Sequence, residues 1–297
     1  MSSITPVARD CNLYRYKGSC FLKKWMSPEF IDSLQDLKIR DDDIFLITYP
    51  KSGTIWTQQI LSLICSEGHR NGTETMNTTS RLPFIEFPKF CNVVDYTNRP
   101  SPRLFASHLP VSFVPQGLKN KKAKVIYVMR NPKDAMTSLY YFEDVALDVK
   151  KSADFEQFFE KFLDGDVYPG KWVDHIKGWH MHKNDYNILF IKYEDMIKDL
   201  RSVVIQICAF LGMELNDEAI DIVVRRASFK GMKMDPLANK EDFPADVLDL
   251  NLGQFMRKGT IGDWKNIMTV AQSETFDKIF QEEIGNLSID FTWDATE

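Results

Sequence analysis

Residues 49–56 read Tyr-Pro-Lys-Ser-Gly-Thr-Ile-Trp, and this stretch decides the fold. It follows the apolar run 44–48 directly and precedes a segment with helical spacing that begins near Ile55. A strand, a turn and a helix N-terminus are therefore predicted in that order. Such a turn directs backbone N–H groups and the positive end of the helix dipole at an anion, and Lys51 adds a full charge. The stretch predicts a P-loop-like site for a phosphorylated ligand.

The turn differs from the nucleoside-triphosphate loop. That loop requires Gly, four residues, Gly-Lys and then Ser or Thr, and no glycine precedes Lys51 at that spacing. The next strongly apolar run, 125–129, leads into Arg130 rather than into an acidic residue that could hold magnesium. We therefore expect an anionic ligand that is handled without a metal. For this segment alone, a solvated strand-turn-helix without function remains the alternative.

The apolar runs that could form buried strands alternate with segments of helical spacing. Near-continuous apolar strands between helices are typical of a parallel sheet that is covered on both faces. No repeat, low-complexity tract or linker divides the chain, so we predict a single α/β domain over residues 1–297 with a central parallel sheet flanked by helices. The strands are predicted at 44–48, 125–129 and 188–193, and helical segments include 134–142 and 200–211.

In a parallel sheet the ligand lies beyond the carboxyl ends of the strands. The residues expected there are Lys51, Arg130 and Tyr193. The predicted strand ends therefore direct their polar side chains toward one crevice.

Composition and charge narrow the class of protein. Hydrophobic residues at 44% and charged residues at 27% describe an ordinary globular protein. A net charge of −5 gives no electrostatic reason to expect nucleic acid as the partner. No segment has the apolar core of a signal peptide, and none approaches eighteen consecutive apolar residues. We expect a cytoplasmic protein with no membrane partner.

A second basic cluster follows the predicted strand 125–129. Ser138 lies eight residues after Arg130, about two helical turns on, so both face the crevice. Arginine has a planar fork that matches phosphate oxygens. The alternative is that Arg130 pairs with Asp134. A third cluster, residues 257–264, reads Arg-Lys-Gly-Thr-Ile-Gly-Asp-Trp and places a basic pair beside two glycines, which suits close backbone approach to an anion.

His108 is the candidate general base. It follows a short apolar segment and precedes Leu109 and Pro110, which places it at a strand-to-loop junction. Its ordinary pKa near 6.5 suits proton removal at neutral pH. The alternative for a single histidine is a packed core residue, and His175 is interpreted as a surface or packing residue.

The long irregular stretch between residues 71 and 102 is expected to contribute a pocket wall, because loops of this length in a compact domain are usually functional. Phe84, Phe87 and Phe90 would be costly to leave in water. Residues 233–262 form a second irregular stretch with the same expectation.

Taken together, four segments resemble the cytosolic sulfotransferase family, and the resemblance covers essentially the whole chain in order. They are the turn at 49–54, the segment 130–138, Ser-Phe-Lys-Gly-Met at 228–232 and the run 257–266. The resemblance implies an enzyme that uses 3′-phosphoadenylyl sulfate (PAPS) as the sulfuryl donor and releases adenosine 3′,5′-bisphosphate (PAP), without a metal.

The resemblance also implies which residues hold the donor. One group holds the 5′-phosphate, a second holds the 3′-phosphate, and a third surrounds the adenosine. The first is Lys51, Ser52, Gly53 and Thr54; the second is Arg130, Ser138, Arg257, Lys258 and Gly259; the third is Trp56, Tyr193, Ser228, Phe229 and Met232. Ile55 belongs to the same donor-binding stretch but stands where the family often has a small hydroxyl or amide residue.

The implied reaction is an in-line displacement at sulfur. A hydroxyl or amine of a small hydrophobic acceptor attacks, His108 removes its proton, and Lys51 stabilises the charge on the leaving phosphate, with Ser138 counted among the catalytic residues. Judged by position relative to the motifs, Leu22, Phe84 and Phe142 line the acceptor pocket together with His108.

The acceptor class stays open between phenols, steroids or other alcohols, and arylamines. Phenol-preferring members carry a lysine two residues before the base, and this chain has Ala106 there. One hypothesis is that the acidic pair Glu143 and Asp144 attracts amine acceptors. The alternative is a solvated helix end.

A homodimer is implied by Lys265, Thr269, Val270 and Glu274, which resemble the short dimer motif of the family. An ordinary capped helix start with Thr269 as N-cap is equally compatible. Two other functions remain as alternatives: a non-catalytic protein that binds adenosine bisphosphate, and a nucleotide-dependent small-molecule kinase.

Overall fold

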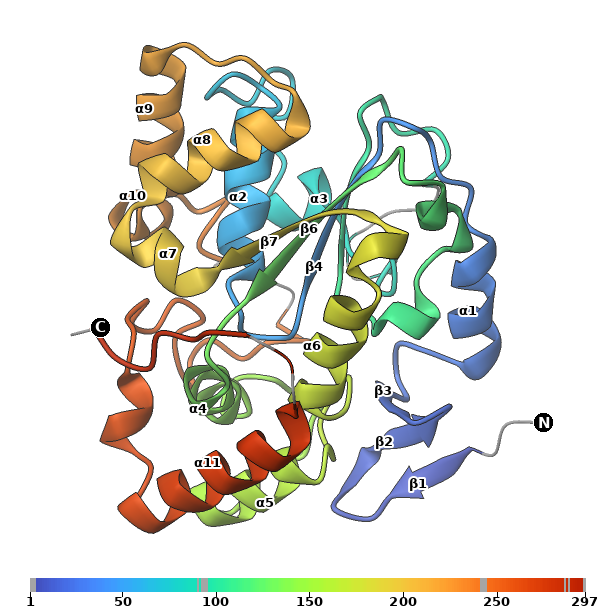
Figure 1. The fold of residues 1–297 in the computed structure, drawn as a ribbon, viewed down its shortest axis with the longest axis vertical. Coiled ribbons are helices and arrows are strands. Elements are labelled where there is room, and N and C mark those ends of the chain that lie inside the picture. Colours follow the sequence, from blue (N-terminus) through green and yellow to red (C-terminus); the bar gives the residue numbers. More distant parts are fainter. Residues whose placement is uncertain are drawn as a thin grey trace.

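Four parallel strands form the central sheet of the computed structural model, which describes residues 4–89, 91, 96–240, 245–285, 287 and 289–295 (Figure 1). The strands are β4 Ile44–Thr48, β5 Leu104–Ser107, β6 Lys124–Met129 and β7 Asn187–Lys192, in the order β5-β4-β6-β7. The parallel sheet flanked by helices is confirmed, and β4, β6 and β7 lie within a residue of their predicted bounds. The fourth strand, β5, was expected only as a short apolar segment before His108.

Alternate residues of β4 pack into two different layers, because successive side chains of a strand point to opposite faces. Ile44 and Leu46 contact the core that is formed with α2, α8 and α9. Phe45 and Ile47 contact the core on the other face, which includes α6. The helices are α1 Pro28–Ser33, α2 Thr54–Ile64, α3 Thr78–Arg81, α4 Pro132–Phe142, α5 Phe155–Leu163, α6 Trp172–Met181, α7 Tyr193–Lys198, α8 Leu200–Leu211, α9 Asp217–Ala227, α10 Phe229–Lys233 and α11 Val270–Ile284.

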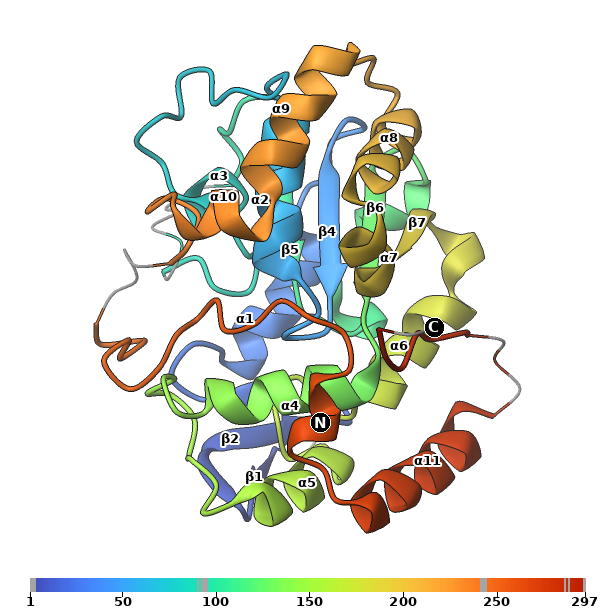
Figure 2. The same cartoon turned by 90° about the vertical axis from the view of Figure 1, so that its left-hand side faces the viewer.

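Three helices begin where the strands of the sheet end. α2 starts after the turn that follows β4, α4 starts just after β6, and α7 starts directly at the end of β7. Figure 2 shows the arrowhead of β4 pointing toward α4, with the segment before α11 crossing the same edge. Asn131 caps α4 by accepting a hydrogen bond from the backbone N–H of Asp134 (2.8 Å), and Pro132 occupies its first turn. Helix N-termini therefore meet at the carboxyl edge of the sheet.

A separate antiparallel sheet was not predicted. It consists of β1 Thr5–Val7, β2 Asp10–Tyr16 and β3 Ser19–Leu22. The phenol of Tyr14 donates to the carbonyl of Met26 (3.1 Å), and Phe21 lies edge-on to Phe113. This sheet brings Leu13 and Leu22 to the wall of the cavity described below.

Two further features concern the chain as a whole. All five cysteines are free thiols. Within the part of the chain that the structure describes, no helix has the length and apolar character needed to cross a membrane.

Candidate functional site

The turn after β4 has a backbone that few residues tolerate. Lys51 has φ +67° and Gly53 has φ +95°, both in the left-handed region. A Cβ on Gly53 would lie 2.7 Å from Cδ2 of Tyr193, so only glycine fits there. Ser52 is fully buried, and its hydroxyl has no hydrogen-bond partner among the described residues. A buried donor without a partner is costly, which is what an absent anion would leave behind.

Arg130 connects this turn to the segment before α11. Its guanidinium donates to the carbonyl of Lys51 (2.9 Å) and to the carbonyl of Thr260 (3.3 Å), and it stacks 4.3 Å over the ring of Tyr193. Its Nε is buried and has no partner among the described residues. Two loops far apart in sequence are thereby held against one cation.

Asp134 does not neutralise Arg130 by a close contact. The nearest nitrogen–oxygen distance is 3.9 Å, while the carboxylate of Asp134 accepts hydrogen bonds from the backbone N–H groups of Gly262 (2.8 Å) and Trp264 (3.0 Å). The predicted alternative for Arg130 is therefore at most a weak interaction. Asp134 instead fastens the basic segment 257–264 to the start of α4.

The basic pair of this segment is oriented by a second carboxylate. Arg257 and Lys258 both bind Asp263, which is buried, and Arg257 also lies 4.4 Å over the ring of Tyr141. Gly259 has φ +67°, and a Cβ there would lie 2.7 Å from the ring of Phe229. The close approach of this backbone to an aromatic ring requires glycine.

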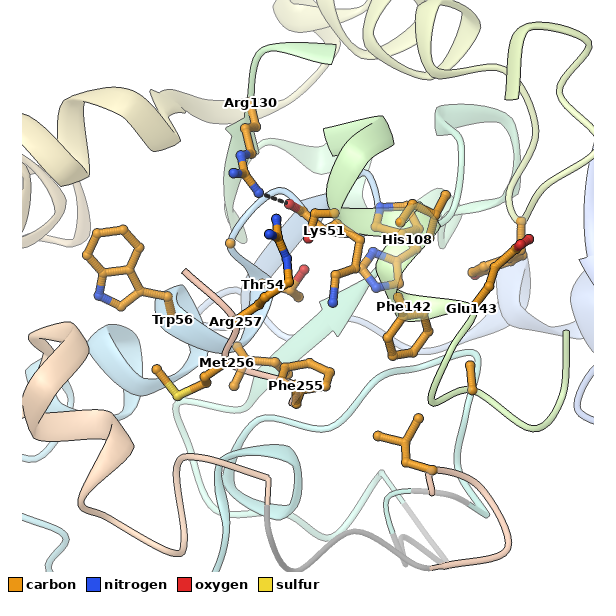
Figure 3. Close-up of a pocket in the computed structure, with 18 of the residues that line it drawn as sticks. Lys51, Thr54, Trp56, His108, Arg130, Phe142, Glu143, Phe255, Met256 and Arg257 are labelled. Carbon is orange, nitrogen blue, oxygen red and sulfur yellow. Dashed lines mark hydrogen bonds between the residues drawn. The ribbon is translucent and has the colours of Figure 1, made fainter. Parts of the chain in front are cut away.

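One cavity of about 330 Å³ collects nearly all the residues singled out from the sequence (Figure 3). Its lining includes residues that were predicted for the phosphates and adenosine, and others that were predicted for the apolar wall and the base. The first group is Lys51, Gly53, Thr54, Ile55, Trp56, Arg130, Ser138, Tyr193, Phe229, Met232, Arg257, Lys258 and Gly259, and the second is Leu22, Phe84, Phe87, His108 and Phe142. Phe90, also expected at this wall, lies outside the described residues.

Ser52 and Ser228 are the two predicted residues outside this lining. Ser52 lies buried in the turn itself. The hydroxyl of Ser228 accepts from the backbone N–H of Gly231 (3.0 Å) and donates to the carbonyl of Arg225 (2.8 Å), so it caps α10. Ser228 is therefore a helix cap and does not itself line the cavity, whereas Phe229 and Met232 of the helix that it caps do.

These residues fit a ligand that carries two separate phosphates. Among the cationic side chains that line the cavity, Lys51, Arg130, Arg257 and Lys258 belong to the predicted phosphate clusters. Among the described residues, Asp263 is the only carboxylate bound at close range to any of these four. The unpartnered Ser52 hydroxyl and Arg130 Nε lie at the same two clusters. The donor set and the tight glycine positions match PAP or PAPS at this site.

The ring of His108 is held in one tautomer. Nδ1 lies 2.8 Å from the carbonyl oxygen of Thr48, and since a carbonyl only accepts, Nδ1 carries the proton. Nε2 is therefore the nitrogen with the free lone pair. Desolvation lowers the pKa of His108 to about 4, helped by the charge of Lys51 and opposed by the hydrogen bond to Thr48. The imidazole is therefore neutral at pH 7, which the predicted role of general base requires, and its pKa lies below the ordinary value on which that prediction relied.

The ammonium of Lys51 lies 4.4 Å from the ring centroids of both Phe142 and Phe255. Desolvation lowers the pKa of Lys51 to about 7, with smaller contributions from the charges of Arg130 and Arg257. Ser138 lines the cavity, and among the described residues no hydrogen bond joins it to Lys51.

Residues 41–288 match the sulfotransferase domain family. The chain is 51% identical to the amine sulfotransferase of Oryctolagus cuniculus over 96% of this chain and 95% of that one. The chain belongs to the sulfotransferase family. It is also 42% identical to sulfotransferase 2B1 of Mus musculus, over 96% of this chain and 83% of that protein.

Solved structures agree with this assignment. The crystal structure of mouse sulfotransferase SULT7A1 complexed with PAP has a TM-score of 0.76 and 35% identity, and the match covers 92% of this chain and 94% of that one. Retinol dehydratase in a complex with retinol and PAP, at 21% identity and a TM-score of 0.82, supports the fold. This sulfotransferase is therefore a transferase of the EC 2.8.2 class, in a family whose sulfuryl donor is PAPS.

Several residues that the sequence did not single out surround His108, the candidate base of this sulfotransferase. Thr48 binds Nδ1 of His108, Glu86 accepts from the backbone N–H of His108 (2.6 Å), and Tyr168 donates to Glu86 (3.2 Å). His175, buried as a packing residue, lies within 3.1 Å of the carbonyl of His108. A signal existed for Glu86, because it is a lone acid within an apolar stretch.

The acidic pair at the end of α4 is already neutralised. Glu143 is buried and binds Lys161 (2.8 Å), and Asp144 binds Lys151 (2.8 Å). Glu143 also lies apart from Lys51 and His108 (Figure 3). Because both carboxylates are paired with lysines, this geometry does not support the hypothesis that Glu143 and Asp144 attract amine acceptors.

The segment that resembles the dimer motif starts α11. Thr269 is its N-cap and forms a capping box with Gln272, as the local alternative expected, while Val270 next to it is 75% exposed. Lys265 binds Asp294. Both interpretations of this segment are compatible with this geometry.

Proposed function

We propose that this sulfotransferase transfers the sulfuryl group of PAPS to a hydroxyl or amine of a small hydrophobic acceptor, with His108 as the general base. The observation that carries the proposal is the position of His108 on the wall of one cavity that also contains Lys51 and both phosphate-directed clusters. Its hydrogen bond to Thr48 leaves Nε2 to accept a proton. The single domain, the cytoplasmic location and the homodimer through Lys265, Thr269, Val270 and Glu274 stay predictions.

The residues proposed to bind PAPS form two groups, one for each of its phosphates. Lys51, Ser52, Gly53 and Thr54 would hold the 5′-phosphate, and Arg130, Ser138, Arg257, Lys258 and Gly259 the 3′-phosphate. Aromatic surfaces for the adenosine come from Trp56, Tyr193 and Phe229, with Ser228 and Met232 supporting this wall and Ile55 beside it. When bound, PAPS supplies a sulfuryl group already activated on phosphate.

The protein groups act on protons and charge. His108 accepts the proton of the attacking group through Nε2, and Lys51 stabilises negative charge that grows on the leaving phosphate. Arg130 and Arg257 add fixed positive charge at the other phosphate, so the donor is bound and oriented before reaction.

The acceptor side is apolar, with Leu22, Phe84 and Phe142 around the base. Such a wall suits a flat hydrophobic alcohol, phenol or amine. The similarity to an amine sulfotransferase at 51% identity supports amines among the acceptors.

The test is transfer of labelled sulfate from PAPS to a panel of arylamines, alkylamines, phenols and steroids. We expect saturable transfer to at least one amine, and loss of transfer in His108→Ala. PAP binding without transfer to any acceptor would favour the non-catalytic alternative. Phosphate transfer from ATP that depends on magnesium would favour the kinase alternative.

A further inference from the structure

Phe142 and Phe255 form an aromatic corner that holds an ammonium group. Their ring centroids are 6.1 Å apart and their planes meet at 86°, so the two faces stand nearly at right angles. The ammonium of Lys51 lies over both rings at 4.4 Å from each centroid (Figure 3). Each distance is well within the range of a cation–π contact.

This ammonium is held by the rings rather than by an acid. Among the described residues Lys51 makes no ion pair. The carboxylates that line the same cavity are bound elsewhere: Glu143 to Lys161, Asp148 to Lys24 and Asp263 to Lys258. The corner is therefore a site that selects a cation by the negative faces of two rings.

Both rings of the corner line the cavity that contains the candidate base. Phe142 ends α4, Phe255 lies in the segment before α11, and both line the cavity that contains His108. The proposed function requires Lys51 at the 5′-phosphate. An anion there attracts the ammonium away from the rings, because a full negative charge outweighs a ring quadrupole.

We propose that, once Lys51 engages the donor, this corner receives the nitrogen of an amine acceptor, so that Phe142 and Phe255 favour amines over alcohols of the same shape. This inference rests on the proposed function and names the acceptor class of that site. It replaces the acidic pair as the source of amine preference.

The chemistry of the two acceptors explains the preference. The amine lone pair forms the N–S bond while the S–O bond to the 5′-phosphate breaks, and the electron pair of that bond passes to the phosphate oxygen. The nitrogen becomes positively charged as it attacks, and its proton then passes to Nε2 of His108. Two ring faces stabilise this charge. A hydroxyl that loses its proton to the base during attack carries less positive charge.

The same surroundings help an ammonium to become a nucleophile. Desolvation is the main reason that the pKa of Lys51 falls to about 7, and it acts on any amine that is placed there. Burial therefore favours the free base that attacks, while the two ring faces favour the ammonium whose affinity is measured in the PAP complex.

The first experiment compares 2-phenylethylamine with 2-phenylethanol, two acceptors that differ in the reacting group. Their affinities are measured calorimetrically on the PAP-bound enzyme, which cannot react. Phe142, and separately Phe255, is replaced by phenylalanines with one, two and three ring fluorines, which weaken the ring quadrupole while nearly preserving its shape. We expect the amine affinity to fall stepwise, by about tenfold across the series, with the alcohol affinity unchanged within about twofold.

Phe87 provides the matched control, because it lines the same cavity outside the corner. Fluorination of Phe87 should leave the ratio of the two affinities unchanged. A constant ratio across the Phe142 and Phe255 series would overturn the inference. If labelled sulfate reaches neither acceptor although PAP binds, the proposed function itself fails, so the two failures are distinguishable.

A second measurement tests the exchange of cations. PAP should raise the affinity for the amine more than for the alcohol, because it draws Lys51 out of the corner. Lys51→Met should remove this difference by leaving the corner open without PAP. Equal amine affinity with and without PAP in the parent enzyme would contradict the exchange.

Discussion

At the scale of single residues, the site depends on which protonation state each group holds. Thr48 fixes the tautomer of His108, and burial keeps the ring neutral. Burial acts against the proposed role of Lys51. It lowers the pKa of the side chain to about 7, whereas the proposed role requires a charged ammonium. The candidate base therefore already has the protonation state that its proposed role requires, whereas Lys51 needs a bound anion to keep its charge.

His108→Ala should abolish turnover and leave PAP affinity within about threefold, because the imidazole acts on the acceptor proton rather than on the donor phosphates. Arg130→Ala is the contrasting variant and should weaken PAP binding by about 2 kcal/mol through the loss of a charge-assisted contact. Single-turnover rates and calorimetric PAP titrations check both. Full activity of His108→Ala would overturn the role of the base.

PAP binding should take up a proton above pH 7. The pKa of Lys51 is about 7 in the donor-free protein, so the amine is mostly neutral at pH 8. A bound phosphate favours the charged form and raises that pKa, so binding captures a proton and PAP affinity falls as pH rises through this window. Calorimetry at pH 8 in buffers of different ionisation enthalpy measures the uptake. The same uptake in Lys51→Met would assign it to another group.

At the scale of elements, the residues of the site lie at the carboxyl edge of the parallel sheet. β4 delivers the turn 49–54, β6 delivers Arg130, and Asp134 in α4 ties the segment 257–264 to the same edge. Periodicity predicted β4, β6 and β7 closely. It missed the sheet of β1–β3, because residues 5–22 are mixed polar and their faces are covered by distant parts of the chain.

Gly259→Ala should weaken PAP binding by about tenfold while the protein still folds. Its Cβ would come within 2.7 Å of the Phe229 ring at φ +67°, which displaces both the backbone and an aromatic wall of the donor site. Gly72→Ala is the matched control, because Gly72 has φ +82° but nothing within 4 Å of an added Cβ. PAP titrations and thermal unfolding distinguish them. Equal PAP affinity in the two variants would contradict this explanation.

At the scale of the whole molecule, Val270 is the exposed apolar residue of the segment that resembles the dimer motif. Val270→Glu should shift the protein from dimer to monomer, because a carboxylate in a small apolar contact is strongly unfavourable, and sulfate transfer per chain should persist. Light scattering after size-exclusion chromatography measures the mass. A parent protein that is already monomeric at micromolar concentration would refute the dimer.

The sequence by itself determined the parallel sheet and the turn after its first predicted strand, and it singled out His108 as the candidate base, because these depend on local periodicity and on residues close together in the chain. The tertiary structure decided how those groups behave. Thr48 fixes His108 from 60 residues away, and Lys161 neutralises Glu143 from 18 residues away. Phe255 meets Phe142 only through packing. Protonation, charge balance and the aromatic corner depend on long-range contacts, which no local pattern encodes.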